Sequence, residues 1–434
     1  MNSVQNVCSR CVQADAENSP SKGIKLLENS HINLDKGNST TIRSADMGAL
    51  RTFVFTVACG LLAANLYYAQ PLISAIGSSL HVAETTLGLI VTLTQIGYCL
   101  GLLFVVPLAD RMENRKLVCI LVGIAALAMA SAGLATSATV FFASVAIAGL
   151  SSVGAQVLVP LAAHLSPPSQ QGRVIGTIMA GLLTGVMLAR PVSSALAGIG
   201  DWRLAFLLPA GLLGILAVTL WMIVPDYRGS RNLGYGAMLR SMFGLLAQEP
   251  VLRRRAFYQA CLFCAFNLFW TGVPLLLNRR FGFGHEEIAL FALAGAGGAL
   301  AAPLAGRMAD RGLTRIGSGL AMLTLAVSFA LMIPATFAGM VIVLALLAIA
   351  LDAGTQANQV LSQNVVYSLR PEARGRINAI YMAIMFVGGA VGSALAPLLY
   401  IKGGWNACAL AGTILALVAL GTFATERRPA RGVQ

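Results

Sequence analysis

The chain repeats itself about 200 residues apart, and the repeat limits the folds that it can adopt. Six short matches recur in the same order, at offsets of 200, 202 or 203 residues. They pair Asn65–Tyr68 with Asn267–Trp270, Asp110 with Asp310, Gln156 with Gln359, Gly172 with Gly375, Gly185 with Gly388, and Trp202 with Trp405. A single match means little, but six in order indicate a duplicated unit. We therefore expect two similar halves that differ slightly in loop length.

Each copy contains six long apolar segments. Of the 434 residues, 57% are hydrophobic and 11% are charged, a composition that indicates contact with lipid. A helix needs about twenty residues to cross a hydrocarbon layer of roughly 30 Å. Such segments lie at 52–76, 86–109, 117–137, 139–163, 174–199, 203–225, 256–278, 287–309, 316–336, 339–365, 377–400 and 405–425. The sequence predicts an all-α integral membrane protein with twelve transmembrane helices in two pseudo-symmetric six-helix bundles.

The polar segments divide the chain into five parts. We expect a disordered tail at 1–47, bundles at 48–225 and 255–425, a linker at 226–254 and a short tail at 426–434. Within the linker, residues 238–247 are weakly amphipathic and suit a short helix at the membrane surface. Met47 is an alternative start of the chain. The first residues lack the apolar core of a signal peptide.

The net charge of +13 follows from membrane topology. If the N-terminus is cytoplasmic, all but five of the thirty Lys and Arg residues fall on the cytoplasmic side. The exceptions are Arg190, Arg203, Arg279, Arg280 and Lys402. This asymmetry is the positive-inside rule, so we expect both termini in the cytoplasm and a multi-pass protein of a bacterial inner membrane. A nucleic-acid partner is not expected.

Two charges lie deep within predicted spans, Arg190 on the fifth and Asp352 on the tenth. A charge at the centre of a bilayer costs roughly 2.5–3.5 kcal/mol, so each needs a reason to be there. Because they belong to opposite halves, they can pair directly or through water. A buried acid that loses its basic partner can take up a proton, which makes Asp352 a candidate for proton coupling. A purely structural ion pair between the halves is an equally good explanation.

The tenth span also carries a polar stripe. Asp352, Gln356, Gln359 and Gln363 fall within about 60° of one another on a helix. Such a stripe faces either a partner helix or an aqueous cavity. Four polar residues in line, with Gln156 as the symmetry mate on the fourth span, favour a cavity wall.

Amides and aromatic rings on the first and seventh spans are further candidates for this cavity. Helical spacing places these residues on matching faces: Asn65, Tyr68, Asn267, Trp270 and Thr271. The same spacing directs Tyr67 elsewhere, toward a neighbouring helix. Gln95 and Tyr98 on the second span suit bonding between helices at least as well as a role in the cavity.

The loop after the second span carries a recognisable motif. Pro107–Lys116 reads PLADRMENRK, and Gly306–Gly312 after the eighth span reads GRMADRG. The sequence here resembles the major facilitator superfamily, whose loop has the form G-x-L-A-D-R-x-G-R-R/K, although Val106 replaces the first glycine and Glu113-Asn114 replaces Gly-Arg. The resemblance implies a cytoplasmic gate between the halves and a cavity lined by spans one, four, seven and ten. The gate residues that it implies are Asp110, Arg111, Arg115, Lys116, Asp310 and Arg311.

A narrower resemblance is to bacterial arabinose-efflux and drug:proton antiporter members of that superfamily. It rests on Asn65–Leu72, on Gln363-Asn364, on Arg370–Arg374 and on Asn378. It implies export of small organic molecules in exchange for protons. Two hallmarks of drug exporters differ: the fourth span has Val145, Ala148 and Gly149 in place of R-x-x-Q-G, and the fifth has Arg190-Pro191 in place of Gly-Pro.

We therefore expect a secondary transporter that acts by alternating access on a small-molecule substrate, coupled to protons and working as a monomer. An importer or facilitator on the same fold is the alternative, and a non-transporting sensor is a further one. An enzyme is not expected, because no nucleophile with a base is placed within the spans. We expect no cofactor and no metal. The sequence has no G-x-x-x-x-G-K-[ST] loop for ATP.

Overall fold

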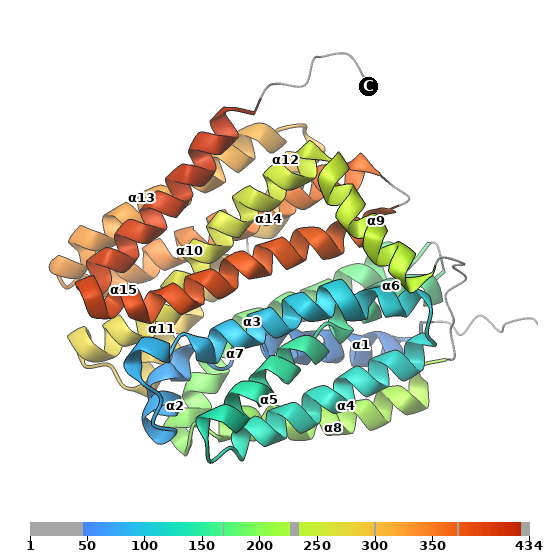
Figure 1. Cartoon of the computed structure of the whole chain (residues 1–434), viewed down its shortest axis with the longest axis horizontal. Coiled ribbons are helices and arrows are strands. Elements are labelled where there is room, and N and C mark those ends of the chain that lie inside the picture. The colour runs from blue at the N-terminus through green and yellow to red at the C-terminus, as the bar shows by residue number, and fades with distance from the viewer. Residues whose placement is uncertain (1–46, 168, 226–233, 299–300, 371–372, 427–434) are drawn as a thin grey trace, which may run out of the picture. The chain divides into compact units, whose positions relative to one another are not determined.

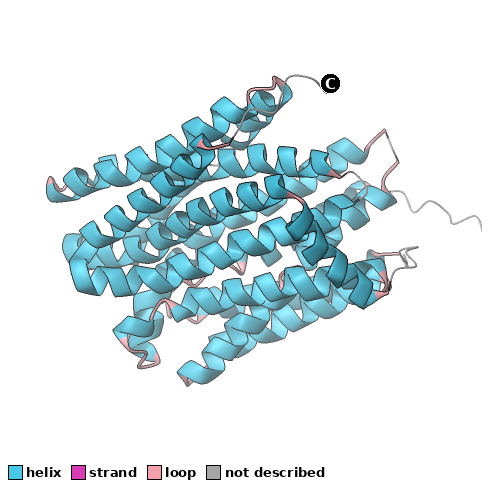
Figure 2. Cartoon of the chain, turned by 45° about the horizontal axis from the view of Figure 1, so that its top comes forward, coloured by secondary structure: helices cyan, strands magenta, loops and turns pink. Residues whose placement is uncertain are grey.

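The computed structural model describes residues 47–167, 169–225, 234–298, 301–370 and 373–426. Every regular element in these ranges is a helix (Figure 2). Apart from Met47, the expected N-terminal tail lies outside them. Residues 226–233 of the expected linker and nearly all of the expected C-terminal tail also lie outside.

The first half comprises eight α-helices and four short 3-10 or π segments. They are α1 (Ala49–Ala64), η1 (Gln70–Leu72), α2 (Ile73–Ser79), η2 (Glu84–Thr86), α3 (Leu89–Leu100), η3 (Gly101–Val105), η4 (Val106–Asp110), α4 (Asn114–Gly133), α5 (Ala138–Ser151), α6 (Gly154–Leu165), α7 (Gln171–Ile199) and α8 (Leu204–Ile223). The linker helix α9 (Tyr235–Gln248) follows. The second half holds α10 (Pro250–Phe281), α11 (His285–Gly298), α12 (Ala301–Asp310), α13 (Thr314–Phe337), α14 (Val341–Leu369) and α15 (Arg374–Ala424).

The helices match the predicted spans. Within the described ranges, nine continuous helical stretches are long and apolar enough to cross a membrane. The last of them, α15, contains two spans, because Gly403 and Gly404 break the helix and Gly404 has a φ of +62°. The first span falls on α1, η1 and α2, and the eighth on α11 and α12. The described residues of the twelve predicted spans thus lie mainly on helices.

The two halves lie side by side, the first in blue to green and the second in yellow to red (Figure 1). We call the end that holds α2 and the start of α11 the hairpin end. The opposite end, which holds α9, is the linker end.

Within each half, small residues bring one pair of helices into close contact, and the pair is the equivalent one in both halves. A Cβ atom on Gly185 would collide with Gly60, which brings α7 against α1. In the second half, a Cβ atom on Gly388 or Gly392 would collide with the backbone of α10 at Ala260 or Cys264. Small residues allow such close approach between helices in lipid, and the equivalent use in both halves agrees with the duplication.

The first span is not a continuous α-helix. It leaves α geometry after Ala64, passes through turns at 65–69 and continues as η1 and α2. Pro71, in the first turn of η1, has no backbone N–H to donate. Side chains after Ala64 therefore do not follow the 100° spacing of an α-helix, which matters for the site described below.

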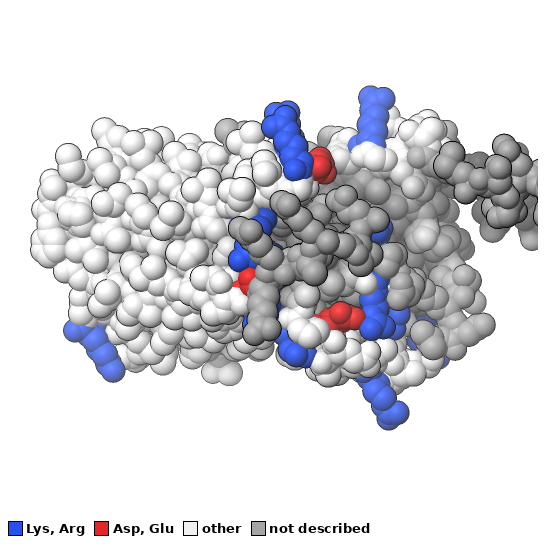
Figure 3. Space-filling model, turned by 90° about the horizontal axis from the view of Figure 1, so that it is seen from above, with Lys and Arg blue, Asp and Glu red and all other residues white. Residues whose placement is uncertain are grey.

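The surface is mostly apolar. Ile199, Met222 and Ile342 are each more than 75% exposed, as expected for side chains that face lipid. On the face seen in Figure 3, charged side chains gather mainly toward the linker end, and a wide uncharged area lies beside them. This distribution suits a protein that crosses a membrane along its helices.

Candidate functional site

Asp352 lies on α14 and is 4% exposed. Its Oδ1 atom accepts a hydrogen bond of 2.9 Å from the indole Nε1 of Trp270, on α10. The donor partly satisfies a carboxylate that has little contact with solvent. Trp270 is itself 2% exposed, so the pair forms a buried polar contact within one half.

Arg190 approaches the same indole from the first half. Its guanidinium carbon lies 4.4 Å from the ring centroid of Trp270, 4.7 Å from that of Tyr67 and 5.2 Å from that of Phe266. Cation–π attraction stabilises a desolvated arginine in such a cage by about 2 kcal/mol or more. The ion pairs found among the described side chains do not include Arg190 with Asp352. Trp270 thus connects the two deep charges, which form no direct ion pair among the described side chains.

Arg190 also begins a buried hydrogen-bond network that crosses between the halves. Its Nε donates to Gln70 at 2.6 Å, and the amide of Gln70 donates to Asn267 at 3.0 Å. Gln95 donates to the same oxygen of Asn267, at 2.5 Å. Gln70 is not among the residues predicted for the site, and Gln95 was expected to bond between helices at least as readily as to line the cavity. A signal for Gln70 was present, because a lone amide within an apolar span needs a partner.

Further residues extend this network into the second half. The hydroxyl of Thr271 donates to Ser393 Oγ at 3.2 Å, and Gln95 lies 3.4 Å from the same oxygen. Gln70, Asn267, Thr271 and Ser393 are completely buried. The network therefore joins the halves through neutral amides and hydroxyls, which exchange partners at a lower cost than buried charges do.

The break in the first span changes the directions expected for its side chains. Tyr67, predicted to point elsewhere, lies against Arg190. Arg190 lies on α7, so Tyr67 does face a neighbouring helix, at the point where the two halves meet. Asn65 donates to Ser152 within the first half, at 3.2 Å. Tyr68 is 5% exposed, and neither residue is placed in an open space.

The glutamines of α14 lie in a different environment from Asp352. Gln356, Gln359 and Gln363 are half-buried, and the last two approach the sulfur of Met382 at 4.0 and 3.6 Å. Gln156 is also half-buried and donates to the hydroxyl of Tyr98 at 3.1 Å. These residues remain candidates for a cavity wall.

Helix α11 covers Asp352 with glycine. A Cβ atom on Gly295 would come within 2.9 Å of Asp352 Oδ2, and one on Gly298 would collide with the Cβ of Asp352. The backbone of α11 therefore packs directly on the carboxylate. Side chains at these two positions would displace the acid or the helix.

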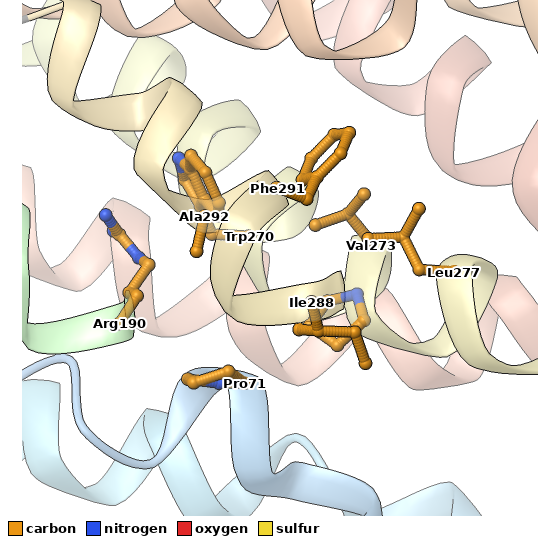
Figure 4. Close-up of a pocket in the computed structure, with 9 residues that line it drawn as sticks. Pro71, Arg190, Trp270, Val273, Leu277, Ile288, Phe291 and Ala292 are labelled. Atoms are coloured by element: carbon orange, nitrogen blue, oxygen red, sulfur yellow. The ribbon is translucent and has the colours of Figure 1, made fainter. Parts of the chain in front are cut away.

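A small pocket lies beside this site, toward the hairpin end (Figure 4). It is lined by Pro71, Arg190, Trp270, Val273, Pro274, Leu277, Ile288, Phe291 and Ala292. Its free volume of about 10 Å³ holds about one water molecule. In this conformation the space next to Arg190 is too small for an organic solute.

The halves also meet near the hairpin end. Glu84, in η2, pairs with Arg279 of α10 at 2.6 Å, and Ser194 of α7 donates to the carbonyl of His285 at 2.7 Å. These contacts, with the network around Arg190, close the hairpin end.

The predicted gate residues lie at the linker end. Lys116 pairs with Glu113 at 2.9 Å, and the guanidinium of Arg115 lies 4.6 Å from the ring of Trp221, both within the first half. Arg111, Asp310 and Arg311 are exposed. The side chain of Asp110 lies outside the described part of the chain. The gate contacts across the halves thus remain a prediction.

Comparison with known sequences identifies the family. The chain matches the Major Facilitator Superfamily over residues 55–353 and again over 256–434. It is 39% identical over 370 residues to the uncharacterized transporter YgaY of Escherichia coli, which covers 85% of this chain and 93% of that protein. It is 25% identical over 207 residues to a "Probable sugar efflux transporter" of Helicobacter pylori, over 48% of this chain and 50% of that protein.

Solved structures show the same fold. The nucleoside transporter NupG superposes with a TM-score of 0.71 at 14% identity, over 86% of this chain and 98% of that one. A D-xylose-proton symporter superposes with a TM-score of 0.63 at 17% identity, over 85% and 96%. The family and the relatives of the present chain are transporters and not enzymes. With its duplicated six-helix halves, the chain is an all-α membrane transporter that belongs to the Major Facilitator Superfamily.

Proposed function

We propose that this transporter exports a small organic solute in exchange for protons, by alternating access across a bacterial inner membrane. The observation that carries the proposal is the position of Asp352, a buried carboxylate tied through Trp270 to a buried arginine of the opposite half. A carboxylate of this kind can hold a proton in one conformation and release it in another. The resemblance to a sugar efflux transporter of Helicobacter pylori supports the outward direction.

Trp270 gives the proposed coupling a physical route. While Asp352 is charged, it accepts the indole N–H and holds the ring beneath Arg190. Protonation of Asp352 weakens both the charge-assisted hydrogen bond and the attraction to the guanidinium. The ring is then free to turn, Arg190 loses part of its cage, and the contacts that close the hairpin end become easier to separate.

The solute would bind between the halves once these contacts open. We assign it the predicted residues Asn65, Tyr68, Gln156, Asn267, Trp270, Thr271, Gln356, Gln359 and Gln363, and we add Gln70. Asp110, Arg111, Arg115, Lys116, Asp310 and Arg311 are proposed to close the linker end in the opposite conformation. The positive-inside distribution supports a cytoplasmic linker end with cytoplasmic termini.

The test is flux in inverted membrane vesicles with an imposed pH gradient, over a panel of drugs and sugars. We expect at least one compound to accumulate only while the gradient is present, and Asp352→Asn to abolish that accumulation. Accumulation that requires solute and proton to move in the same direction would favour the importer instead. If compounds bind but none of them is transported, the result would favour a sensor.

A further inference from the structure

Helix α9 lies at the linker end and runs from the second half toward the first (Figure 1). It packs against α10 and α15 of the second half and against η4 of the first. Its buried side chains are Met238, Met242 and Leu245, each no more than 7% exposed. A helix in this position restrains the movement of the two halves to the extent that it is attached to both.

The attachment of α9 to the second half combines a charged hydrogen bond with an ion pair. Arg376, near the start of α15, donates from Nη1 to the hydroxyl of Ser241 at 2.7 Å. Glu249, directly after α9, pairs with Arg370 at the end of α14 at 2.7 Å. The side chains of Glu249 and Arg370 are 17% and 41% exposed, so solvent screens the pair only in part. Helix α9 is therefore expected to move with the second half.

The attachment of α9 to the first half is weaker. Among the described residues, one hydrogen bond joins them: the hydroxyl of Tyr235, at the start of α9, donates to the backbone carbonyl of Phe104 at 2.7 Å. A neutral hydrogen bond of this kind changes an equilibrium by about two- to tenfold. The bond is thus strong enough to bias a conformation and weak enough to break in each transport cycle.

The sequence leaves the carbonyl of Phe104 available for this bond. The second span passes from the π segment Gly101–Val105 directly into the 3-10 segment Val106–Asp110. In 3-10 geometry a carbonyl bonds the N–H three residues later, and for Phe104 that residue is Pro107, which has no N–H. Pro107 also begins the motif that carries the predicted gate residues. Tyr235 therefore holds the first half where the second span leads into this motif.

We propose that Tyr235 is a latch: carried on the second half by α9, it binds the first half at Phe104 while the hairpin end is closed, and it releases Phe104 when that end opens. The proposal rests on alternating access, but not on the direction of transport or on the coupling ion. Because α9 follows the second half, a movement that opens the hairpin end shifts Phe104 relative to Tyr235. A hydrogen bond weakens steeply when its distance and angle change in this way.

Labelling of a buried cysteine on intact cells measures the opening without a substrate. Val273 lines the small pocket near the hairpin end and is 2% exposed. A membrane-impermeant maleimide should react with Val273→Cys only while the hairpin end is open to the outside, and the protein without this substitution gives the background from the native cysteines. We expect Tyr235→Phe, which removes one hydroxyl, to raise the labelling rate about two- to tenfold.

A second variant tests the same bond from the side of the acceptor. Pro107→Ala supplies an N–H that can bond the carbonyl of Phe104 within the second span, and so competes with Tyr235. It should also raise the labelling rate. Adding Tyr235→Phe to it should have little further effect, because both changes break one contact. Full additivity of the two changes would contradict the latch.

Tyr367→Phe is the matched control. Its hydroxyl donates to Asn378 at 2.8 Å within the second half, so the same chemical change should leave the labelling rate unaltered. An unchanged rate in Tyr235→Phe, or an equal increase in Tyr367→Phe, would overturn the latch. Absence of labelling at Val273→Cys in every variant would instead contradict opening of the hairpin end, on which the proposed function depends, so the two failures can be told apart.

Discussion

The indole nitrogen of Trp270 donates a 2.9 Å hydrogen bond to Asp352, and the same ring forms one wall of the cage around Arg190. One side chain therefore contacts both deep charges, which belong to different halves. A substitution at Trp270 therefore tests whether the two charges are linked through this ring.

Trp270→Phe removes the N–H donor and keeps an aromatic ring near Arg190. A hydrogen bond to a charged group contributes about 1.5–3 kcal/mol, so we expect proton-driven flux to fall by at least about tenfold while solute exchange persists. Trp405→Phe is the control, because its buried indole nitrogen has no partner among the described groups. Equal effects of the two substitutions on driven flux would contradict a special role of the Trp270 hydrogen bond.

Gly298→Ala should displace Asp352, since the added carbon would collide with the carbon that carries its carboxylate. Overpacking of this kind costs about 1–3 kcal/mol, and we expect a lower melting temperature together with loss of driven flux. Gly211→Ala on α8 is the control, because nothing lies within 4 Å of its new carbon. Melting in detergent and flux in vesicles are the measurements. A Gly298→Ala protein with normal values in both would show that α11 does not seal the acid.

Asn267→Leu should weaken the closed hairpin end, because it leaves the amides of Gln70 and Gln95 without their shared acceptor. Each unsatisfied buried donor costs about 1–3 kcal/mol. Gln359→Leu, at a half-buried position 4.0 Å from the sulfur of Met382, should lower stability much less. Thermal unfolding of the two variants in one detergent tests this difference, and comparable losses of stability would argue against the network as a closing contact.

Glu84 and Arg279 mark the closed hairpin end. Both are largely exposed, so loss of the ion pair should change stability by no more than about 1 kcal/mol. A covalent link between the two positions, in contrast, should affect transport strongly. A short bifunctional thiol reagent across Glu84→Cys and Arg279→Cys should stop transport, and each single cysteine variant treated alike should remain active. Full transport by the cross-linked double variant would show that this end does not need to open.

The sequence predicted the fold in detail because length and apolarity decide whether a segment crosses lipid. Asp352 and Arg190 stood out for the same reason, since a charge within an apolar span is costly. Helical spacing from Asn267 selected Trp270 as a cavity residue, but its contacts with both charges depend on side-chain conformations that spacing does not encode.

The first span marks the limit of prediction from periodicity. Turns at 65–69 and the proline at position 71 end the α-helical spacing after Ala64. Tyr67, within these turns, lies against Arg190, and Asn65 bonds within its own half. A lone amide in an apolar span marks Gln70 as a residue that needs a partner, but the sequence does not reveal that the partner is Asn267, about 200 residues away.

The two deep charges should also depend on each other despite the lack of direct contact. Arg190→Ala and Asp352→Ala each leave one uncompensated charge in a region of low dielectric, which is worse than removing both. We expect the double variant to reach a higher membrane level than either single variant and to lack driven flux. Strictly additive effects on membrane level would show that Trp270 does not transmit an interaction between them.

The most direct test of the account compares two kinds of flux in Asp352→Asn, in proteoliposomes with a substrate found by the vesicle panel. Exchange of labelled for unlabelled solute needs no net proton movement, whereas uptake driven by a pH gradient does. We predict that Asp352→Asn retains exchange and loses driven uptake. Driven uptake at the level of the unmodified protein would contradict the proposal that Asp352 carries the proton.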